Sequence, residues 1–262
     1  MNILNEARVI VEDKINLDEI EVKKIVLGLG YTGVQLSNGE AGVCHSIVSE
    51  TSPDCCDILD NAGNLTDLGV KELVSFIDSW DLFKRIIGVA TLNALSQKIV
   101  KENPERYPFV KDNLINVLNI KNDDQVAMVG LIRPFVDPLR NRAKQLYILE
   151  RSRPLPEGVF PDTACEELLP ESDIVIITGS AMANGTLDRL LDLSKDSREI
   201  VVVGPTISIV PDPLFRRGVT YCGGVQVKNS DLLMTILSEA GGTPQMKREA
   251  VDLVTYKNPG LF

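Results

Sequence analysis

Hydrophobic residues in the second half of the chain cluster in four short runs, and each run ends at a turn of polar or glycine residues. Runs this short and this rich in Val and Ile are typical of strands buried on both faces of a parallel sheet. Stretches of helical length separate them, so the pattern predicts an α/β fold with a mostly parallel sheet and flanking helices. The four predicted strands are residues 126–129, 146–149, 174–177 and 200–203.

The second half also carries signals for shorter elements. Asp137-Pro138 is typical of a helix N-cap followed by Pro at the first helical position. Glycine pairs such as Gly241-Gly242 commonly follow the end of a helix. The other predicted elements are a helix at 187–194, a short turn at 213–217, a fifth strand at 219–222 and a last helix at 230–240.

The first half of the chain has a different pattern. Apolar residues at helical spacing predict a helix at 2–14, and Asn38-Gly39 between two strand-like segments is a strong hairpin signal. We therefore expect an antiparallel meander, with strands within 19–29, at 34–36 and at 42–48. Helices are expected after an N-cap at Thr66 or Asp67, at 81–101 and at 109–118.

A polar turn at 119–124 separates the two patterns, and we place a domain boundary there. Residues 1–120 are expected to form an α+β domain, because helices flank a meander. Residues 121–262 are expected to form the α/β domain, because strands and helices alternate.

Composition narrows the class of protein. The 262 residues carry a formal net charge of −10, which argues against a nucleic-acid partner because such proteins need a basic surface. A local arginine can still bind an anionic small molecule. No apolar run reaches membrane-spanning length and no signal pattern begins the sequence, so we expect a cytoplasmic protein without a membrane partner. We expect free thiols at the five cysteines, and the acidic surface permits a homo-oligomer.

The ends of the predicted parallel strands carry the first candidate ligand-binding residues. Ligands of such sheets lie outside the carboxyl ends of the strands. Gly130 after one strand and Glu150 after the next resemble the Rossmann arrangement for a nucleoside, although the Gly-x-Gly-x-x-Gly fingerprint is missing. Arg133 could bind a carboxylate or phosphate. The alternatives are that Glu150 pairs with Arg151 or Arg153, and that Arg133 is solvated or pairs with Asp137.

Two later turns concentrate small polar residues. Their hydroxyl and main-chain N–H groups suit a polar ligand, and their alternative role is the capping of the helices that follow. The candidate ligand-binding residues there are Thr178, Gly179, Ser180, Asn184, Thr186, Gly204 and Thr206.

The first half supplies the candidate catalytic residues. His45 is the only histidine and could act as a general base, although a half-buried structural histidine is the alternative. Tyr31 is a second candidate catalytic residue and Thr32 a candidate ligand contact, because both lie in a turn after a strand. Asn93 interrupts an apolar helix, so its amide contacts either a ligand or a neighbouring helix.

The cysteines suggest a weaker metal hypothesis. Cys55 and Cys56 are adjacent and lie between two aspartates, so a soft metal could bind there with help from Cys44 and His45. The sequence contains no Cys-x-x-Cys and identifies no cofactor.

The ordered set of short motifs resembles a family of uncharacterised prokaryotic proteins labelled as heavy-metal-chelation proteins. The resemblance covers essentially the whole chain. The motifs are Gly28-Leu-Gly-Tyr31-Thr32, Gly39-Glu-Ala-Gly42, Gly88-Val-Ala-Thr-Leu-Asn93-Ala94, Gly130, Thr178-Gly179-Ser180 with Asn184-Gly185-Thr186, and Val203-Gly204-Pro205-Thr206.

The resemblance implies an N-terminal domain like that of enolases, followed by a Rossmann-like domain, with the site between them. It also implies condensation or hydrolysis of a pterin-, flavin- or siderophore-like compound linked to heavy-metal chelation. Our leading hypothesis is therefore a small-molecule enzyme or binding protein with an interdomain cleft, whose ligand is anionic or metal-chelating. The alternatives are an S-adenosylmethionine-dependent methyltransferase, suggested by Gly130 and Glu150, and a non-catalytic heavy-metal-binding protein.

Overall fold

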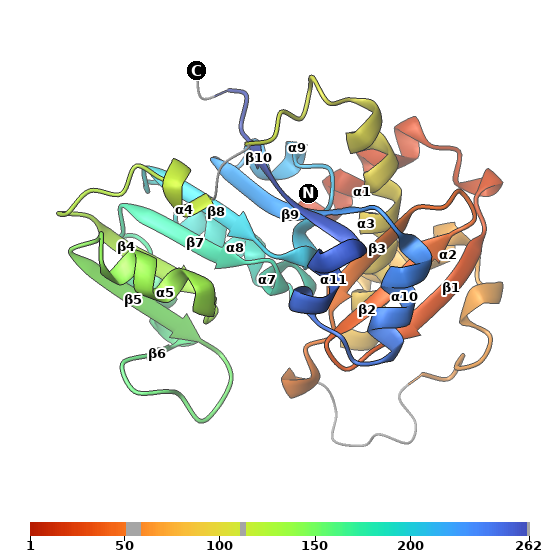
Figure 1. Ribbon diagram of the computed structural model, residues 1–262, viewed down its shortest axis with the longest axis horizontal. Coiled ribbons are helices and arrows are strands. Elements are labelled where there is room, and N and C mark those ends of the chain that lie inside the picture. The colour runs from red at the N-terminus through yellow and green to blue at the C-terminus, as the bar shows by residue number, and fades with distance from the viewer. Residues whose placement is uncertain (51–58, 111–113, 261–262) are drawn as a thin grey trace.

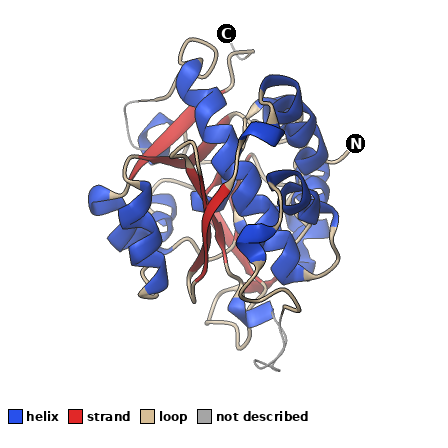
Figure 2. Cartoon of the chain, turned by 90° about the vertical axis from the view of Figure 1, so that its right-hand side faces the viewer, coloured by secondary structure: helices blue, strands red, loops and turns tan. Residues whose placement is uncertain are grey.

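The computed structural model describes residues 1–50, 59–110 and 114–260. It contains a three-stranded sheet from the first part of the chain and a seven-stranded sheet from the second part (Figure 1). Helices cover both sides of the strands (Figure 2). The fold is therefore mixed α/β, as the sequence pattern predicted.

The small sheet is the predicted antiparallel meander. It pairs β1 (Val22–Leu27) with β2 (Tyr31–Leu36), and β2 with β3 (Ala41–His45). Gly39 in the β2–β3 turn has a φ of +87°, a conformation that glycine adopts without strain. The hairpin prediction at Asn38-Gly39 is therefore confirmed.

Helices precede and follow the meander. Asn2 caps α1 through its side chain, and Asp81 caps the long α3 in the same way. The predicted cap at Thr66 or Asp67 is wrong, because residues 65–67 form a 3-10 turn and the next helix begins after Gly69. Within the described part of 109–118, only one short helix forms. The helices are α1 (Ile3–Lys14), α2 (Val70–Ser75), α3 (Leu82–Glu102) and α4 (Leu114–Val117).

The large sheet has the strand order β10-β9-β8-β7-β4-β5-β6. All neighbouring pairs are parallel except β10 with β9. The four predicted strands are confirmed as β4, β5, β7 and β8. The strands are β4 (Gln125–Val129), β5 (Gln145–Glu150), β6 (Phe160–Pro161), β7 (Ile174–Thr178), β8 (Glu199–Val203), β9 (Tyr221–Val227) and β10 (Val251–Lys257).

The strand order reverses at β4. From β4 the chain proceeds outward through β5 and β6 on one side, and then returns to place β7, β8 and β9 on the other. Such a switch point separates the loops that follow the two neighbouring strands, and a crevice forms between them. In this chain the crevice lies at the carboxyl ends of β4 and β7.

Helices connect these strands, and three predictions about them are wrong. The helix that was predicted to begin after an N-cap at Asp137 begins earlier, at Arg133. Pro134 occupies its second position, and Pro138 lies inside the helix, where it removes one hydrogen bond. Residues 213–217 include the short helix α9 rather than only a turn, and the helix at 230–240 is followed by α11 and β10. The helices are α5 (Arg133–Arg140), α6 (Cys165–Leu168), α7 (Ser180–Ala183), α8 (Leu187–Leu193), α9 (Asp212–Phe215), α10 (Ser230–Ser238) and α11 (Thr243–Glu249).

The two halves of the chain interlock around the small sheet. Gly42 on β3 packs against the main chain of α3, whereas Gly33 on β2 faces Leu237 of α10. The small sheet therefore lies between a helix of the first half and a helix of the second half. A division of the chain at residue 120 stays a prediction.

Gln97 on α3 fastens the helix to the large sheet. Its Nε2 donates to the Val225 carbonyl oxygen at 2.9 Å, and its Oε1 accepts from the Val227 N–H at 3.0 Å.

Among the described residues, none of the helices is both long enough and apolar enough to cross a bilayer.

Candidate functional site

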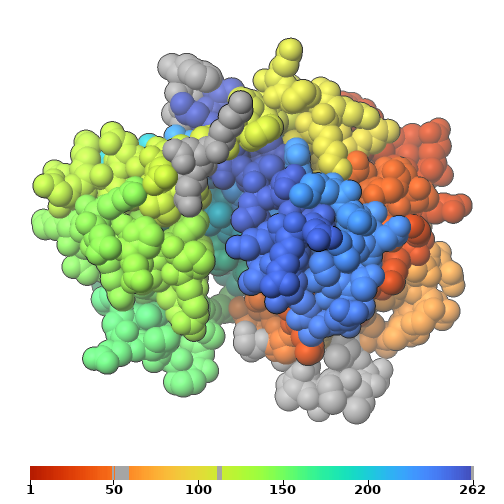
Figure 3. Space-filling view, in the orientation of Figure 1, coloured from red at the N-terminus to blue at the C-terminus, as the bar shows by residue number. Residues whose placement is uncertain are grey.

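A cavity of about 540 Å³ lies at the carboxyl ends of β4, β5 and β7. The end of β3 and the following 3-10 turn η2 (Val48–Glu50) form its opposite wall. In the space-filling view the surface is indented between the green segments on the left and the dark blue segment of α11 (Figure 3). The sequence-predicted residues that line the cavity are Tyr31, His45, Gly130, Glu150, Thr178, Ser180, Asn184 and Thr186.

Gly130 lets the turn after β4 pass close to β7. Its φ is +88°, and a Cβ at this position would lie 2.7 Å from Thr178 Cγ2. Both the backbone conformation and the available space therefore require glycine. The tight turn leaves room for the cavity at the switch point.

Glu150 ends β5 with its carboxylate held by main-chain N–H groups. Oε2 accepts from Leu131 at 3.0 Å, and Oε1 accepts from Arg151 at 2.7 Å and Ser152 at 3.1 Å. Burial alone would raise the pKa of Glu150, but the hydrogen bonds from Leu131, Ser152 and Arg151 lower it below its usual value. Glu150 is therefore an ionised carboxylate that joins the β4 and β5 turns.

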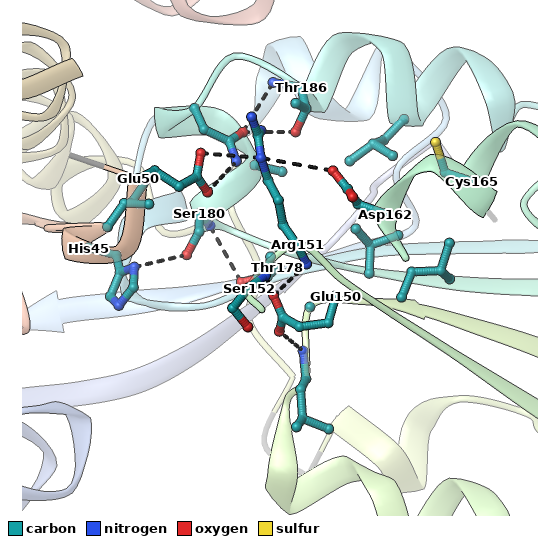
Figure 4. Close-up of a pocket in the computed structure, with 18 of the residues that line it drawn as sticks. His45, Glu50, Glu150, Arg151, Ser152, Asp162, Cys165, Thr178, Ser180 and Thr186 are labelled. Carbon is teal, nitrogen blue, oxygen red and sulfur yellow. Dashed lines mark hydrogen bonds and ion pairs between the residues drawn. The ribbon is translucent and has the colours of Figure 1, made fainter. Parts of the chain in front are cut away.

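Arg151 crosses the mouth of the cavity. Its Nε lies 3.3 Å from Glu50 Oε2 and 3.9 Å from Asp162 Oδ2 (Figure 4). Asn184 Nδ2 donates to the other oxygen of Glu50 at 3.5 Å. One arginine therefore links the wall after β3 with the loop that follows β6.

His45 and Ser180 contact each other in the cavity. The hydroxyl Oγ of Ser180 lies 3.4 Å from Nδ1 of His45 (Figure 4). The His45 ring makes an edge contact with Tyr31, with centroids 5.4 Å apart and an interplanar angle of 70°. Burial lowers the pKa of His45, and the nearby carboxylates of Glu50 and Glu150 only partly oppose this effect.

Two predicted site residues, Asn93 and Thr206, lie behind His45 rather than in the cavity lining. The main-chain N–H of His45 donates to Thr206 Oγ1 at 2.9 Å. Asn93 is fully buried, and its Nδ2 donates to the carbonyl oxygens of Thr206 and Val43, both at 2.8 Å. Asn93 Oδ1 has no hydrogen-bond partner. These contacts hold β3 against the 3-10 turn η6 (Pro205–Ile207) and so fix the position of His45.

Other predicted residues have structural contacts outside the cavity lining. Thr32 Oγ1 lies 3.2 Å from Ser46 Oγ in the interior. The N–H groups of Gly179 and Gly204 donate to carbonyl oxygens of the neighbouring strands. Arg133 is exposed at the start of α5 and lies outside the cavity lining, so its contact with an anion stays a prediction. Asn184 Oδ1 accepts from Thr186 Oγ1 at 2.8 Å, which supports the interpretation that these two residues stabilise the loop.

Several cavity residues had no sequence-based prediction. Arg151 directly follows the predicted strand end at Glu150, so its position was a usable signal. The others lie within or after elements whose side-chain directions the sequence pattern did not reveal. They are Ile47, Glu50, Asp162, Cys165 and Arg189.

The described residues do not form a closed metal site. No group of three or more His, Cys, Asp or Glu side chains within them could hold a metal ion. Burial raises the pKa of Cys44, which opposes formation of the thiolate that a soft metal requires. Cys55 and Cys56 lie outside the described residues. Within the part of the chain that the structure describes, the donor set around the cavity therefore does not fit a directly bound heavy metal.

Family models match most of the chain. The DUF364 model, described as "Putative heavy-metal chelation", matches residues 113–255. The DUF4213 model, with the same description, matches residues 10–96. An uncharacterized protein of Methanocaldococcus jannaschii is 32% identical over 191 residues, which cover 71% of this chain and 72% of that protein.

Two crystal structures of DUF364-family proteins with unknown function share the fold. The Pyrococcus horikoshii protein superposes with a TM-score of 0.80 at 24% identity. The Desulfitobacterium hafniense protein gives 0.78 at 26% identity. Each comparison covers 97% of this chain and 98% of the other.

Proposed function

The chain belongs to the family described as "Putative heavy-metal chelation", and from this premise we propose that its cavity binds a small organic molecule. The observation that carries the proposal is a cavity of about 540 Å³ at the switch point of a parallel sheet. Small-molecule sites prefer this position and this range of volume. We infer a binding protein or enzyme whose ligand, rather than the protein alone, provides the link to metal chelation.

The lining of the cavity favours a ligand with an apolar body and a polar edge. Leu131, Leu149 and Leu190 contribute apolar surface. Ser180 contributes a hydroxyl that can bind a heteroatom. A pterin- or flavin-like ring combines both properties, so this class of compound is our first choice.

The charges around the cavity disfavour a strongly anionic ligand. Arg151 already contacts Glu50 and Asp162, and Arg189 forms an ion pair with Glu166. A ligand anion would have to displace a protein carboxylate from one of these arginines. We therefore propose a neutral or weakly charged compound.

The contacts of Glu150 disfavour the methyltransferase alternative. In nucleoside-binding Rossmann sites the acidic residue at this position accepts hydrogen bonds from the ribose. Here both carboxylate oxygens already accept from main-chain N–H groups. This engagement favours a structural role for Glu150 over S-adenosylmethionine binding.

Isothermal titration of the purified protein tests the proposal. We expect saturable heat with a pterin or a flavin, and weaker or no heat with S-adenosylhomocysteine. Leu131→Trp should fill part of the cavity and weaken binding at least tenfold, whereas Leu29→Trp, at a leucine that is 72% exposed and lies outside the lining, should not. Flat titrations with all three classes, or equal effects of the two tryptophan variants, would contradict the proposal.

A further inference from the structure

Ser180 and His45 reach the cavity from opposite walls and meet inside it. Their Oγ–Nδ1 distance of 3.4 Å is within hydrogen-bond reach. A serine beside an imidazole is the arrangement that activates a hydroxyl for attack, and this contact is often longer in the absence of substrate. We propose that Ser180 is a nucleophile, and His45 its general base, for hydrolysis of an ester or amide group on the molecule bound in the cavity. This inference rests on the proposed function of the cavity.

The surroundings of His45 position its main chain and keep its ring neutral. The main-chain N–H of His45 donates to Thr206 Oγ1, and the imidazole lies edge-on to Tyr31. Burial lowers the pKa of His45, so the ring is unprotonated at neutral pH. A general base must be unprotonated to accept the serine proton. Thr206, and Asn93 behind it, act as positioning residues.

A main-chain hydrogen-bond donor lies next to Ser180. The main-chain N–H of Ala181, the next residue, has no acceptor within the described parts of the chain. Ala181 lines the same cavity. A main-chain donor next to the nucleophile can stabilise the oxyanion of a tetrahedral intermediate.

Backbone strain marks the wall that carries His45. Ile47 lies two residues after His45, lines the cavity and has a φ of +46°. A β-branched residue in this conformation is a genuine outlier, and strain of this kind clusters at functional sites. The strained turn brings Glu50 to the cavity after His45.

The proposed reaction consumes one water molecule. The Oγ of Ser180 forms a bond to the carbonyl carbon, and its proton passes to Nδ1 of His45. The bond to the leaving alcohol or amine then breaks, and the imidazolium returns the proton to that group. Water attacks the acyl-serine, gives its proton to His45 and releases the acid, and the proton returns to Ser180.

A serine-directed probe tests the proposal on the intact protein. The protein is incubated with a dialkyl fluorophosphate, and the adduct is measured by intact mass and located by peptide mapping. We expect one adduct on Ser180 that is lost in Ser180→Ala and forms about 100-fold more slowly in His45→Gln. Ser238→Ala, at an exposed serine of α10, is the matched control and should be labelled like the unmodified protein.

The outcomes separate this inference from the proposed function. The folded protein could bind a pterin or flavin and yet form no adduct on Ser180. That result would reject Ser180 as a nucleophile without contradicting the proposed binding function. Labelling of Ser180 at an unchanged rate in His45→Gln would overturn the role of His45. Labelling of Ser180 in a protein that binds none of the titrated compounds would support the nucleophile and reject the proposed class of ligand.

Discussion

Two sets of polar side chains in this protein have similar chemistry and different surroundings. On α3, the amide of Gln97 is buried and both of its ends are bonded to the main chain of β9. In the cavity, Ser180 and His45 share one long contact. The buried Gln97 holds the two halves of the chain together. The second set keeps hydrogen-bonding capacity for a ligand.

The difference shows that polarity and burial alone do not identify a site. Asn93 and His45 are both polar residues in apolar segments, yet only His45 lines the cavity. A buried amide is costly without partners, so the fold supplies main-chain carbonyl oxygens to Asn93 Nδ2. A side chain at a cavity can instead be satisfied by solvent or by a ligand.

Gly42→Ala should give the largest effect, because it separates the small sheet from α3. An added Cβ would lie 2.2 Å from the main-chain nitrogen of Ala94 and 2.3 Å from the carbonyl oxygen of Ala90. Backbone atoms cannot move as a side chain can, so we expect a loss of about 3 kcal/mol or more in the free energy of unfolding. Urea denaturation measures it. Gly30→Ala, where the nearest atom lies at 3.5 Å, is the control and should change stability by less than about 1 kcal/mol.

Gln97→Leu should give the next largest effect on stability. It leaves the Val227 N–H and the Val225 carbonyl oxygen without their side-chain partner, which costs about 1–3 kcal/mol. Ser96→Ala, at a buried neighbour bonded only to its own helix, should cost less than about 1 kcal/mol. Denaturant titrations measure both variants. Equal losses in the free energy of unfolding would contradict the structural role of Gln97.

The pH dependence of the free energy of unfolding should reveal the burial of His45, which belongs to the cavity set. Its folded pKa is lowered by burial, against the opposing charges of Glu50 and Glu150 and beside the ring of Tyr31. Above pH 6.5, the ordinary pKa of a histidine, His45 is neutral in both the folded and the unfolded protein. Its protonation therefore does not reduce the free energy of unfolding there. As the pH falls below 6.5 the unfolded chain takes up the proton first, and stability declines until the folded pKa is passed.

A matched variant isolates this contribution. The free energy of unfolding of His45→Gln should fall less steeply between pH 6.5 and 5 than that of the unmodified protein. Parallel curves for the two proteins would show that His45 is not buried as described.

Ser180→Ala should have the smallest effect on folding. Its long contact with His45 faces a cavity that water can fill, so we expect a change of less than about 1 kcal/mol. Thr206→Val, which leaves the His45 N–H without its acceptor, should cost about 1–3 kcal/mol. Calorimetric unfolding of both variants measures the difference. A larger loss of unfolding free energy for Ser180→Ala than for Thr206→Val would show that Ser180 has a structural role.

Much of the fold could be predicted from local patterns. The runs at β4, β5, β7 and β8 and the turn at Asn38-Gly39 are strong local signals, because buried strands and tight turns restrict residue choice. The helix α11 and the strand β10 were missed. Gly241-Gly242 was interpreted as the end of the last helix, although β10 pairs with β9 beyond it.

The candidate site was partly predictable for the same reason. Strand ends are visible in the sequence, so Glu150, Thr178 and Ser180 could be assigned to one edge of the sheet. Arg133 follows the same rule but lies outside the cavity lining at the start of α5. The direction of a side chain depends on where its helix begins, which the misleading Asp137-Pro138 signal obscured.

The sequence by itself determined the alternation of buried strands and helices, the meander and the positions of the polar strand ends, because these follow from hydrophobic periodicity and turn chemistry. Only the tertiary structure decided which polar groups share a cavity. Contacts such as His45 with Ser180, and Glu50 with Arg151, join residues more than 100 positions apart. Long-range packing creates such contacts, so no local pattern records them.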